Sequence, residues 1–126
     1  MDFSGLSVLA KSCFYNMFYY CRNLADHPAM PANSVAMEES CYDSMFYYCN
    51  SLSAVPQLGS TSLAKNCYRN MFYGCGTRTW QNGAYVFSGI QNAPALPATA
   101  LAEGCYDSMF YGCYNLGTGS QMPVIS

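Results

Sequence analysis

The sequence predicts an α/β fold, a short solenoid of four strand–helix units with one hairpin insertion. Three observations predict it. A sixteen-residue block recurs four times, with a shared core of Cys, three residues, Met-Phe-Tyr, one residue and Cys. Apolar side chains within each block recur at helical spacing, and three short segments that read as extended chain end in proline.

The period of the repeat is typical of the leucine-rich-repeat class. The first cysteines of the blocks are 28, 26 and 38 residues apart, at Cys13, Cys41, Cys67 and Cys105. Leucine-rich repeats have periods of about 20–29 residues and stack one strand and one helix or turn per unit. The longest interval is then a normal unit with an insertion. A chain of 126 residues forms one domain, so we predict a single leucine-rich-repeat solenoid over 1–126. Its units lie around 6–24, 25–52, 53–78 and 90–116, with the insertion at 78–89.

Two elements are expected in each unit. In the last block, Leu101, Cys105 and Met109 stand at i, i+4 and i+8, which places them on one face of a helix. The other blocks repeat this spacing, so helices are predicted up to about each Met-Phe pair. The strand segments end in proline, which stops a ladder because it lacks an N–H. These segments are Leu24–Pro28, Leu52–Pro56 and Ile90–Pro94.

Charge alternates between units at one block position. Opposite charges in successive units favour helices that lie side by side, with each charged side chain facing the next. Exposed pairs of this kind contribute about 0.5 kcal/mol at most, so they set register more than stability. The pattern explains the block carboxylates structurally and argues against a catalytic role for them. The alternating position holds Lys11, Glu39, Lys65 and Glu103, and a second position holds Asp43, Arg69 and Asp107.

The eight cysteines have three interpretations. The favoured one is a small buried hydrophobe, because the cysteines share the apolar face of the block. Disulfides within or between units would suit an exported protein. A zinc site is disfavoured because no CxxC occurs and no histidine accompanies the cysteines, so we expect no metal and no cofactor. The cysteines pair as Cys13/Cys21, Cys41/Cys49, Cys67/Cys75 and Cys105/Cys113.

The insertion at 78–89 departs most from the repeat. Asn82-Gly83 is a strong hairpin turn signal between 79–81 and 84–87. Insertions in solenoids often lie on the binding side, and Trp, Tyr and Arg dominate binding hot spots. The competing interpretation is that the hairpin folds back over a solenoid edge. The predicted binding residues are Arg78, Trp80, Tyr85 and Phe87 in the insertion, with His27, Gln91 and Asn92 at varied strand positions.

One tyrosine position recurs in all four blocks. Stacking would align these tyrosines in a ladder, which we interpret as edge packing. The alternative is an aromatic binding strip that also includes Tyr20, Tyr48 and Tyr114. His27, the single histidine, is interpreted as a surface residue and not as a general base, because no nucleophile can be assigned to it. The ladder tyrosines are Tyr19, Tyr47, Tyr73 and Tyr111.

Composition narrows the range of functions. Apolar residues make up 52% of the chain, charged residues only 10%, and the net charge is −2. Without a basic run, binding to nucleic acid through phosphates is not expected. No apolar run approaches about 18 residues, so no membrane span is expected, and the first residues lack the pattern of a signal peptide. No phosphate loop, glycine fingerprint or zinc-protease motif occurs, so we predict that the protein is not an enzyme.

The four blocks resemble the Cys/Met/Phe-rich leucine-rich repeats of BspA-like surface proteins of gut Bacteroidetes. The clearest stretch is LPATALAEGCYDSMFYGC, which ends at Cys113, and the resemblance covers residues 6–75 and 90–116. It implies a leucine-rich-repeat fold, a cell-surface or secreted location and cell adhesion through host or microbial proteins. No catalytic residue belongs to the family pattern. This chain differs in its insertion, its shortness and its lack of an export signal, so a cytoplasmic location stays open.

These observations predict a non-enzymatic, adhesin-like repeat module that recognises a protein or surface partner. A structural or assembly unit of a fibre or surface appendage is one alternative, and a small intracellular inhibitor protein is another. Solenoid ends need polar caps, so apolar terminal segments predict self-association through the ends. These segments contain Phe3, Leu6 and Val8, and Met122, Val124 and Ile125.

Overall fold

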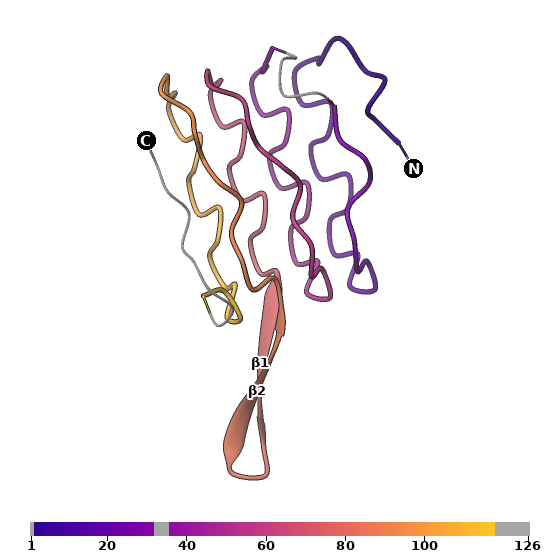
Figure 1. The fold of residues 1–126 in the computed structure, drawn as a ribbon, viewed down its shortest axis with the longest axis vertical. Coiled ribbons are helices and arrows are strands. Elements are labelled where there is room, and N and C mark those ends of the chain that lie inside the picture. Colours follow the sequence, from indigo (N-terminus) through magenta and orange to yellow (C-terminus); the bar gives the residue numbers. More distant parts are fainter. Residues whose placement is uncertain (1, 32–35, 118–126) are drawn as a thin grey trace.

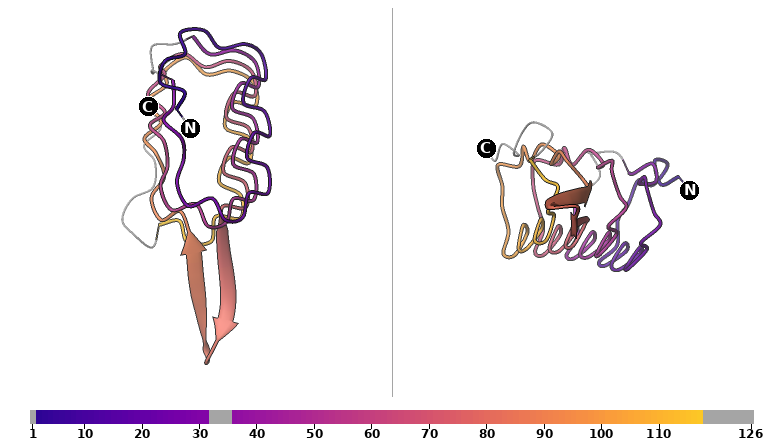
Figure 2. Two further views of the ribbon diagram at one scale, coloured as in Figure 1. Left: turned by 90° about the vertical axis from the view of Figure 1, so that its right-hand side faces the viewer. Right: turned by 90° about the horizontal axis from the view of Figure 1, so that it is seen from below.

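A computed structural model of the chain describes residues 2–31 and 36–117, so the C-terminal Met122, Val124 and Ile125 lie outside the described residues. The described residues form a stack of four coils side by side, with one long hairpin projecting from it (Figure 1). Each coil has one wavy side and one extended side, seen end-on in Figure 2. We call the wavy sides rungs 1 to 4, residues 10–21, 38–49, 64–75 and 102–113, and the extended sides return segments.

The predicted strand–helix unit is wrong. No helix occurs in the described residues, and the two strands there are β1 (Gly76–Gln81) and β2 (Ala84–Gly89), both in the hairpin. The predicted helices are runs of tight turns. The predicted strands at Leu24–Pro28, Leu52–Pro56 and Ile90–Pro94 are stretches of chain outside any strand. The α/β leucine-rich-repeat class is therefore replaced by a helix-free stack of turns.

Backbone N–H groups in each rung alternate between two kinds of partner. The N–H of Cys13 bonds back to the C=O of Ala10, three residues earlier, at 3.2 Å. The next N–H, that of Phe14, instead bonds across to the C=O of Cys41 in rung 2, at 2.9 Å. The alternation continues along each rung, and each rung donates to the next in parallel register. An α-helix would bond each N–H to the C=O four residues earlier, so this pattern excludes a helix.

Every fourth residue of a rung has a positive φ. In rung 3, Asn66, Asn70 and Gly74 have φ values of 56°, 54° and 72°. Glycine and asparagine tolerate this region, and the third position of a type II turn requires it. The predicted helical spacing is therefore a strict period of four that belongs to turns. The equivalent positions are Ser12, Asn16 and Tyr20 in rung 1, Ser40, Ser44 and Tyr48 in rung 2, and Gly104, Ser108 and Gly112 in rung 4.

Side chains point into and out of the stack in successive pairs. In rung 3, Cys67-Tyr68 and Met71-Phe72 are buried, whereas Arg69-Asn70 between them is half-buried. Because the rungs are in register, equivalent aromatic rings stack along the core. Rings of Phe18, Phe46, Phe72 and Phe110 follow one another with centroids 5.6, 5.7 and 5.8 Å apart.

All eight cysteines are free, so the disulfide interpretation is not what the structure shows. The second cysteine of a rung donates its thiol hydrogen to a phenylalanine C=O of the preceding rung. These Sγ···O distances are 3.0 Å for Cys49 to Phe18 and 2.9 Å for Cys75 to Phe46. Burial raises the pKa of the Cys49 thiol to about 12, which keeps the donor protonated. The buried cysteines thus act as hydrophobes that also join adjacent rungs.

Ion pairs also join the rungs. Lys11 pairs with Glu39 at 3.2 Å, and Lys65 pairs with Glu103 at 3.7 Å, as the charge ladder predicts. The remaining predicted pair, between Glu39 and Lys65, is absent among the residues described. At the second position, a buried carboxylate pairs with a half-buried guanidinium in the next rung. The Asp43 Oδ2 to Arg69 Nη2 distance is 2.7 Å.

Candidate functional site

The predicted hairpin is present, and it projects away from the stack instead of folding back over an edge (Figure 2). β1 and β2 pair antiparallel, with Arg78 opposite Phe87 and Trp80 opposite Tyr85. Asn82 and Gly83, with φ values of 50° and 83°, make the turn. Two consecutive positive φ values are what a type I′ turn needs, and such a turn matches the twist of a hairpin.

One face of the hairpin is aromatic. Cross-strand partners share a face, and so do alternate residues of a strand, which places Arg78, Trp80, Tyr85 and Phe87 together. The rings of Trp80 and Tyr85 meet edge to face with centroids 4.9 Å apart. Their exposed fractions are 64% and 51%, and that of Phe87 is 41%. Large aromatic side chains at this exposure form an apolar surface open to a partner.

The guanidinium of Arg78 lies between two aromatic rings. It is 5.0 Å from the ring centroid of Tyr85 and 4.7 Å from that of Tyr114, which follows rung 4. Cation–π contacts of this kind fix the side chain while its charge stays available. Within the described residues, no carboxylate pairs with Arg78. The aromatic face therefore carries one positive charge at its base.

The base of the hairpin is held by the chain that follows rung 4. The side-chain amide of Asn115 donates to the C=O of Gly89 at 3.0 Å, and the N–H of Gly117 donates to the C=O of Gln91 at 2.9 Å. The hairpin is thus anchored at its base on two neighbouring coils, while its tip contacts no other described element.

Replacing Gly89 by alanine should destabilise the protein more than replacing Gly83. Both residues have positive φ, so an added Cβ is strained at either position. At Gly83 that Cβ meets nothing within 4 Å, whereas at Gly89 it would lie against the C=O of Cys75 and 2.6 Å from the Cα of Gly76. We expect a loss of about 1 kcal/mol for Gly83→Ala and about 3 kcal/mol for Gly89→Ala, measured by urea unfolding. Equal losses would contradict the close backbone approach at the hairpin base.

The remaining predicted site residues are not part of the aromatic face. His27 is half-buried on the first return segment, where its ring Nδ1 lies 2.7 Å from the C=O of Pro28. No described contact joins it to the hairpin. Gln91 and Asn92 are exposed just after β2, at the hairpin base. The structure therefore brings four of the predicted residues together, places two beside them and leaves His27 apart.

The sequence placed Tyr114 in the alternative aromatic strip but not beside the insertion. This residue directly follows the second cysteine of the last block, where the other blocks have Arg22, Asn50 and Gly76. The one signal in the sequence is that this block has an aromatic residue at a position where the other three blocks have none. Its role depends on where the chain leaves rung 4 relative to the hairpin, which spacing alone does not give.

The recurrent tyrosines form the predicted ladder. Tyr47 stacks between Tyr19 and Tyr73, with centroid distances of 4.9 and 4.6 Å, and Tyr73 stacks on Tyr111 at 4.7 Å. The end members Tyr19 and Tyr111 are exposed, and the inner ones are half-buried. Rings stacked face to face hide their flat surfaces from a ligand, which favours the edge-packing interpretation.

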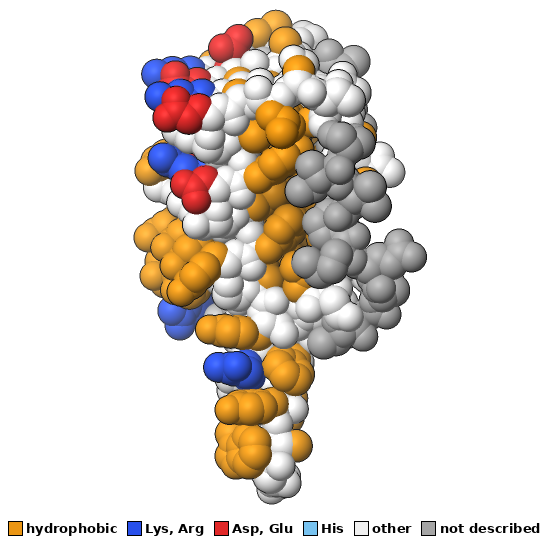
Figure 3. Space-filling model, turned by 90° about the vertical axis from the view of Figure 1, so that its left-hand side faces the viewer, with side chains coloured by type: hydrophobic (Ala, Val, Ile, Leu, Met, Phe, Trp, Pro, Cys, Tyr) orange, Lys and Arg blue, Asp and Glu red, His pale blue; other side chains and the backbone are white. Residues whose placement is uncertain are grey.

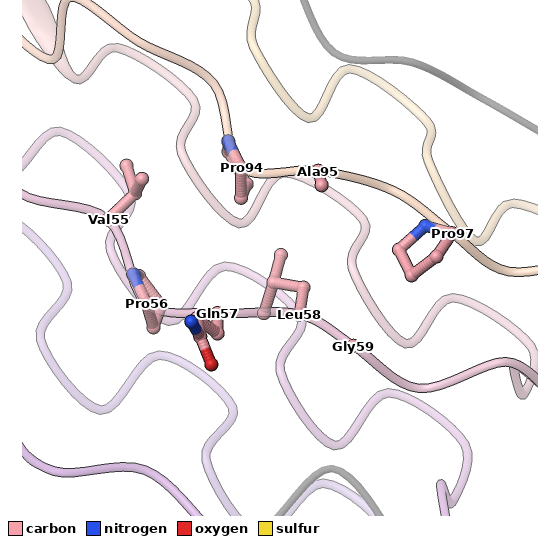
Figure 4. Close-up of a pocket in the computed structure, with 8 residues that line it drawn as sticks. All are labelled: Val55, Pro56, Gln57, Leu58, Gly59, Pro94, Ala95 and Pro97. Atoms are coloured by element: carbon pink, nitrogen blue, oxygen red, sulfur yellow. The ribbon is translucent and has the colours of Figure 1, made fainter.

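A shallow groove of about 330 Å³ separates two return segments (Figure 4). Prolines dominate it, and Gln57 is the one polar side chain among its lining residues. A small-molecule site needs a few convergent polar groups to fix its ligand, and this groove lacks them. Its lining residues are Val55, Pro56, Gln57, Leu58, Gly59, Pro94, Ala95 and Pro97.

No family model, curated protein or solved structure matches the chain. In the described part of the chain, no three His, Cys, Asp or Glu side chains cluster as metal ligands would. That part also contains no helix with the length and apolar character needed to cross a membrane. The aromatic hairpin is therefore the best-built candidate site.

Proposed function

We propose that the chain is a non-enzymatic recognition module that presents the aromatic hairpin to a protein or surface partner. The observation that carries the proposal is the exposed cluster of Trp80, Tyr85 and Phe87 beside Arg78, on an element that projects from a rigid stack. These residue types supply most of the binding energy at protein interfaces.

The chemistry of the face defines the partner that it fits. Three aromatic side chains favour an apolar patch on the partner, and Arg78 favours a carboxylate at its rim. The free edges of β1 and β2 can also accept an added strand. The resemblance to BspA-like repeats supports a cell-surface or secreted location and an adhesin-like role.

A capture experiment tests this proposal. Immobilised wild type is compared with Trp80→Ala/Tyr85→Ala in extracts of host tissue and of bacteria, and each captured protein is purified for affinity measurement. The matched control is Thr79→Ala/Val86→Ala, a cross-strand pair on the opposite face. We expect the aromatic double variant to bind at least about 30-fold more weakly, as loss of a hot spot implies, while the control binds normally. Equal binding by wild type and the aromatic variant would reject the hairpin as the site.

A second candidate function, an assembly unit, is supported by the open ends of the stack.

A further inference from the structure

We propose that the chain assembles head to tail, with rung 4 of one copy docked on rung 1 of the next. The occupant of each open end is thus a second copy of this chain. The proposal does not depend on the hairpin, because the contacts that carry it lie in the rungs.

The two ends present complementary backbone groups. Each inner rung receives hydrogen bonds on one side and donates them on the other, at alternate residues. Among the described residues, no other rung donates backbone hydrogen bonds to rung 1, and no other rung accepts them from rung 4. Within residues 2–31 and 36–117, no hydrogen bond engages the rung 1 C=O groups of Lys11, Cys13, Tyr15, Met17 and Tyr19, or the rung 4 N–H groups of Gly104, Tyr106, Ser108, Phe110 and Gly112.

These free groups have the spacing of the internal junctions. The N–H of Asn66 donates to the C=O of Glu103, and that of Ser12 donates to the C=O of Glu39, at equivalent positions of successive rungs. By the same rule the N–H of Gly104 would donate to the C=O of Lys11 in the next copy. Open ladders with this geometry are templates for edge-to-edge pairing.

The side chains at the two ends are also complementary. Glu103 in rung 4 and Lys11 in rung 1 hold equivalent positions and carry opposite charges, so a junction between copies continues the alternation of charge found within the chain. The exposed ring of Tyr111 would stack on that of Tyr19, as Tyr73 stacks on Tyr111. A contact between different faces of identical copies does not close on itself and so gives filaments.

Among the described residues, one cysteine thiol at the rung 1 end lacks the C=O acceptor that the equivalent thiols of the other rungs have. Cys49, Cys75 and Cys113 each donate to a phenylalanine C=O of the preceding rung, at 2.9–3.0 Å. Cys21 holds the same position in rung 1 and is exposed, and its matching acceptor would be the C=O of Phe110 in the preceding copy. The junction would therefore repeat a side-chain contact that every internal junction makes.

The core positions of both end rungs are apolar, and although some of their side chains are buried, others are more exposed than their equivalents in the inner rungs. Met17 is 41% exposed in rung 1, whereas Met45 and Met71 at the same position are fully buried. Phe110 in rung 4 is half-buried, whereas Phe72 is fully buried. Figure 3, which faces the rung 4 end of the stack, shows a column of hydrophobic side chains, with most of the acidic and basic side chains gathered to one side of it.

The test is the mass of the full chain in solution, measured by sedimentation from low micromolar to near-millimolar concentration. We expect the mass to rise from 13.9 kDa with concentration. A rung 1 variant, Lys11→Glu/Tyr19→Glu, and a rung 4 variant, Glu103→Lys/Tyr111→Lys, should each stay monomeric, because like charges then meet at the junction. These side chains are exposed, so both variants should fold, which circular dichroism checks. An equimolar mixture of the two variants should associate again, because opposite charges and unaltered ends can meet.

Thiol reactivity of the wild type provides a second measurement that needs no variant. Cys13 and Cys21 are the exposed cysteines, and both lie in rung 1. Their reaction with a disulfide reagent should be rapid in dilute solution and lost on assembly. Trp80→Ala/Tyr85→Ala should assemble like the wild type, which separates failure of this proposal from failure of the hairpin proposal. A constant mass of 13.9 kDa, or assembly of either end variant alone, would overturn the proposal.

Discussion

Raising the pH from about 8 to about 11 should lower the free energy of unfolding steeply until the protein unfolds. Burial raises the pKa of Cys41 to about 11 and those of Cys49, Cys67 and Cys113 to about 12, whereas the ordinary value is 9.0. Above pH 9 the unfolded chain releases protons that the folded chain retains. The stabilising contribution of these thiols is therefore complete below pH 9 and is lost as the pH rises toward their folded pKa values.

The size of the effect follows from the number of thiols. Each thiol that ionises only in the unfolded chain lowers the free energy of unfolding by about 1.4 kcal/mol per pH unit, so these four lower it by roughly 6 kcal/mol per pH unit. Burial raises the pKa of Cys75 as well, which adds a fifth thiol to the loss. Small domains have about 5–15 kcal/mol in total, so the protein should unfold within one to three pH units above 9. Burial also raises the pKa of Tyr42 and Tyr68, which adds to the loss above pH 10.

Urea unfolding followed by far-UV circular dichroism at a series of pH values measures this slope. Cys49→Ser is the matched variant, because its hydroxyl can still donate to the C=O of Phe18 but does not ionise in this range. Its slope should be shallower by about a fifth. A free energy of unfolding that stays level across the range would contradict the burial of the thiols.

The stacking of units and the hairpin could be predicted from the sequence because both rest on unambiguous signals. Four copies of one block imply stacking, since each unit must bury its apolar side against a neighbour. Asn82-Gly83 implies a tight turn, since both residues tolerate the positive φ that it requires. The site residues Trp80 and Tyr85 follow from the hairpin, because the two-residue turn fixes which residues face each other.

The helices were predicted wrongly because a strict period of four imitates a helical face over nine residues. A helix has 3.6 residues per turn, so its apolar stripe alternates steps of three and four, whereas Leu101, Cys105 and Met109 keep steps of four. A second signal lay at the intervening positions. Ser, Asn or Gly precedes the first cysteine of every block, and these residues favour turns and caps over helix interiors.

Self-association through the ends was predicted from apolar terminal segments, but the backbone donors and acceptors at the two ends could not be predicted because they depend on turn geometry. Only when alternate N–H groups point along the stack does one end offer donors and the other acceptors. A strand–helix unit would place its free backbone groups on the strands instead. The charge alternation from Lys11 to Glu103 was visible in the sequence, yet its continuation between copies follows only from the observed register.

Replacing Phe46 by alanine should cost about 3–5 kcal/mol, which is the usual range for a fully buried phenylalanine. The ring stacks between those of Phe18 and Phe72, with centroids 5.6 and 5.7 Å away. Its removal leaves a cavity that the rungs cannot close, because backbone hydrogen bonds hold them in register. The free energy of unfolding of Phe46→Ala in urea measures the loss.

Phe18→Ala is the matched control. Phe18 occupies the same block position in rung 1, is half-buried and has one stacking neighbour in its column, so its replacement should cost about half as much. Both variants are compared in dilute solution, where the ends are unoccupied. Equal losses would mean that the core does not form a continuous stack of rings. If the difference between the losses for Phe46→Ala and Phe18→Ala becomes smaller at high protein concentration, a second copy buries Phe18. The stability of the stack would then depend on its assembly.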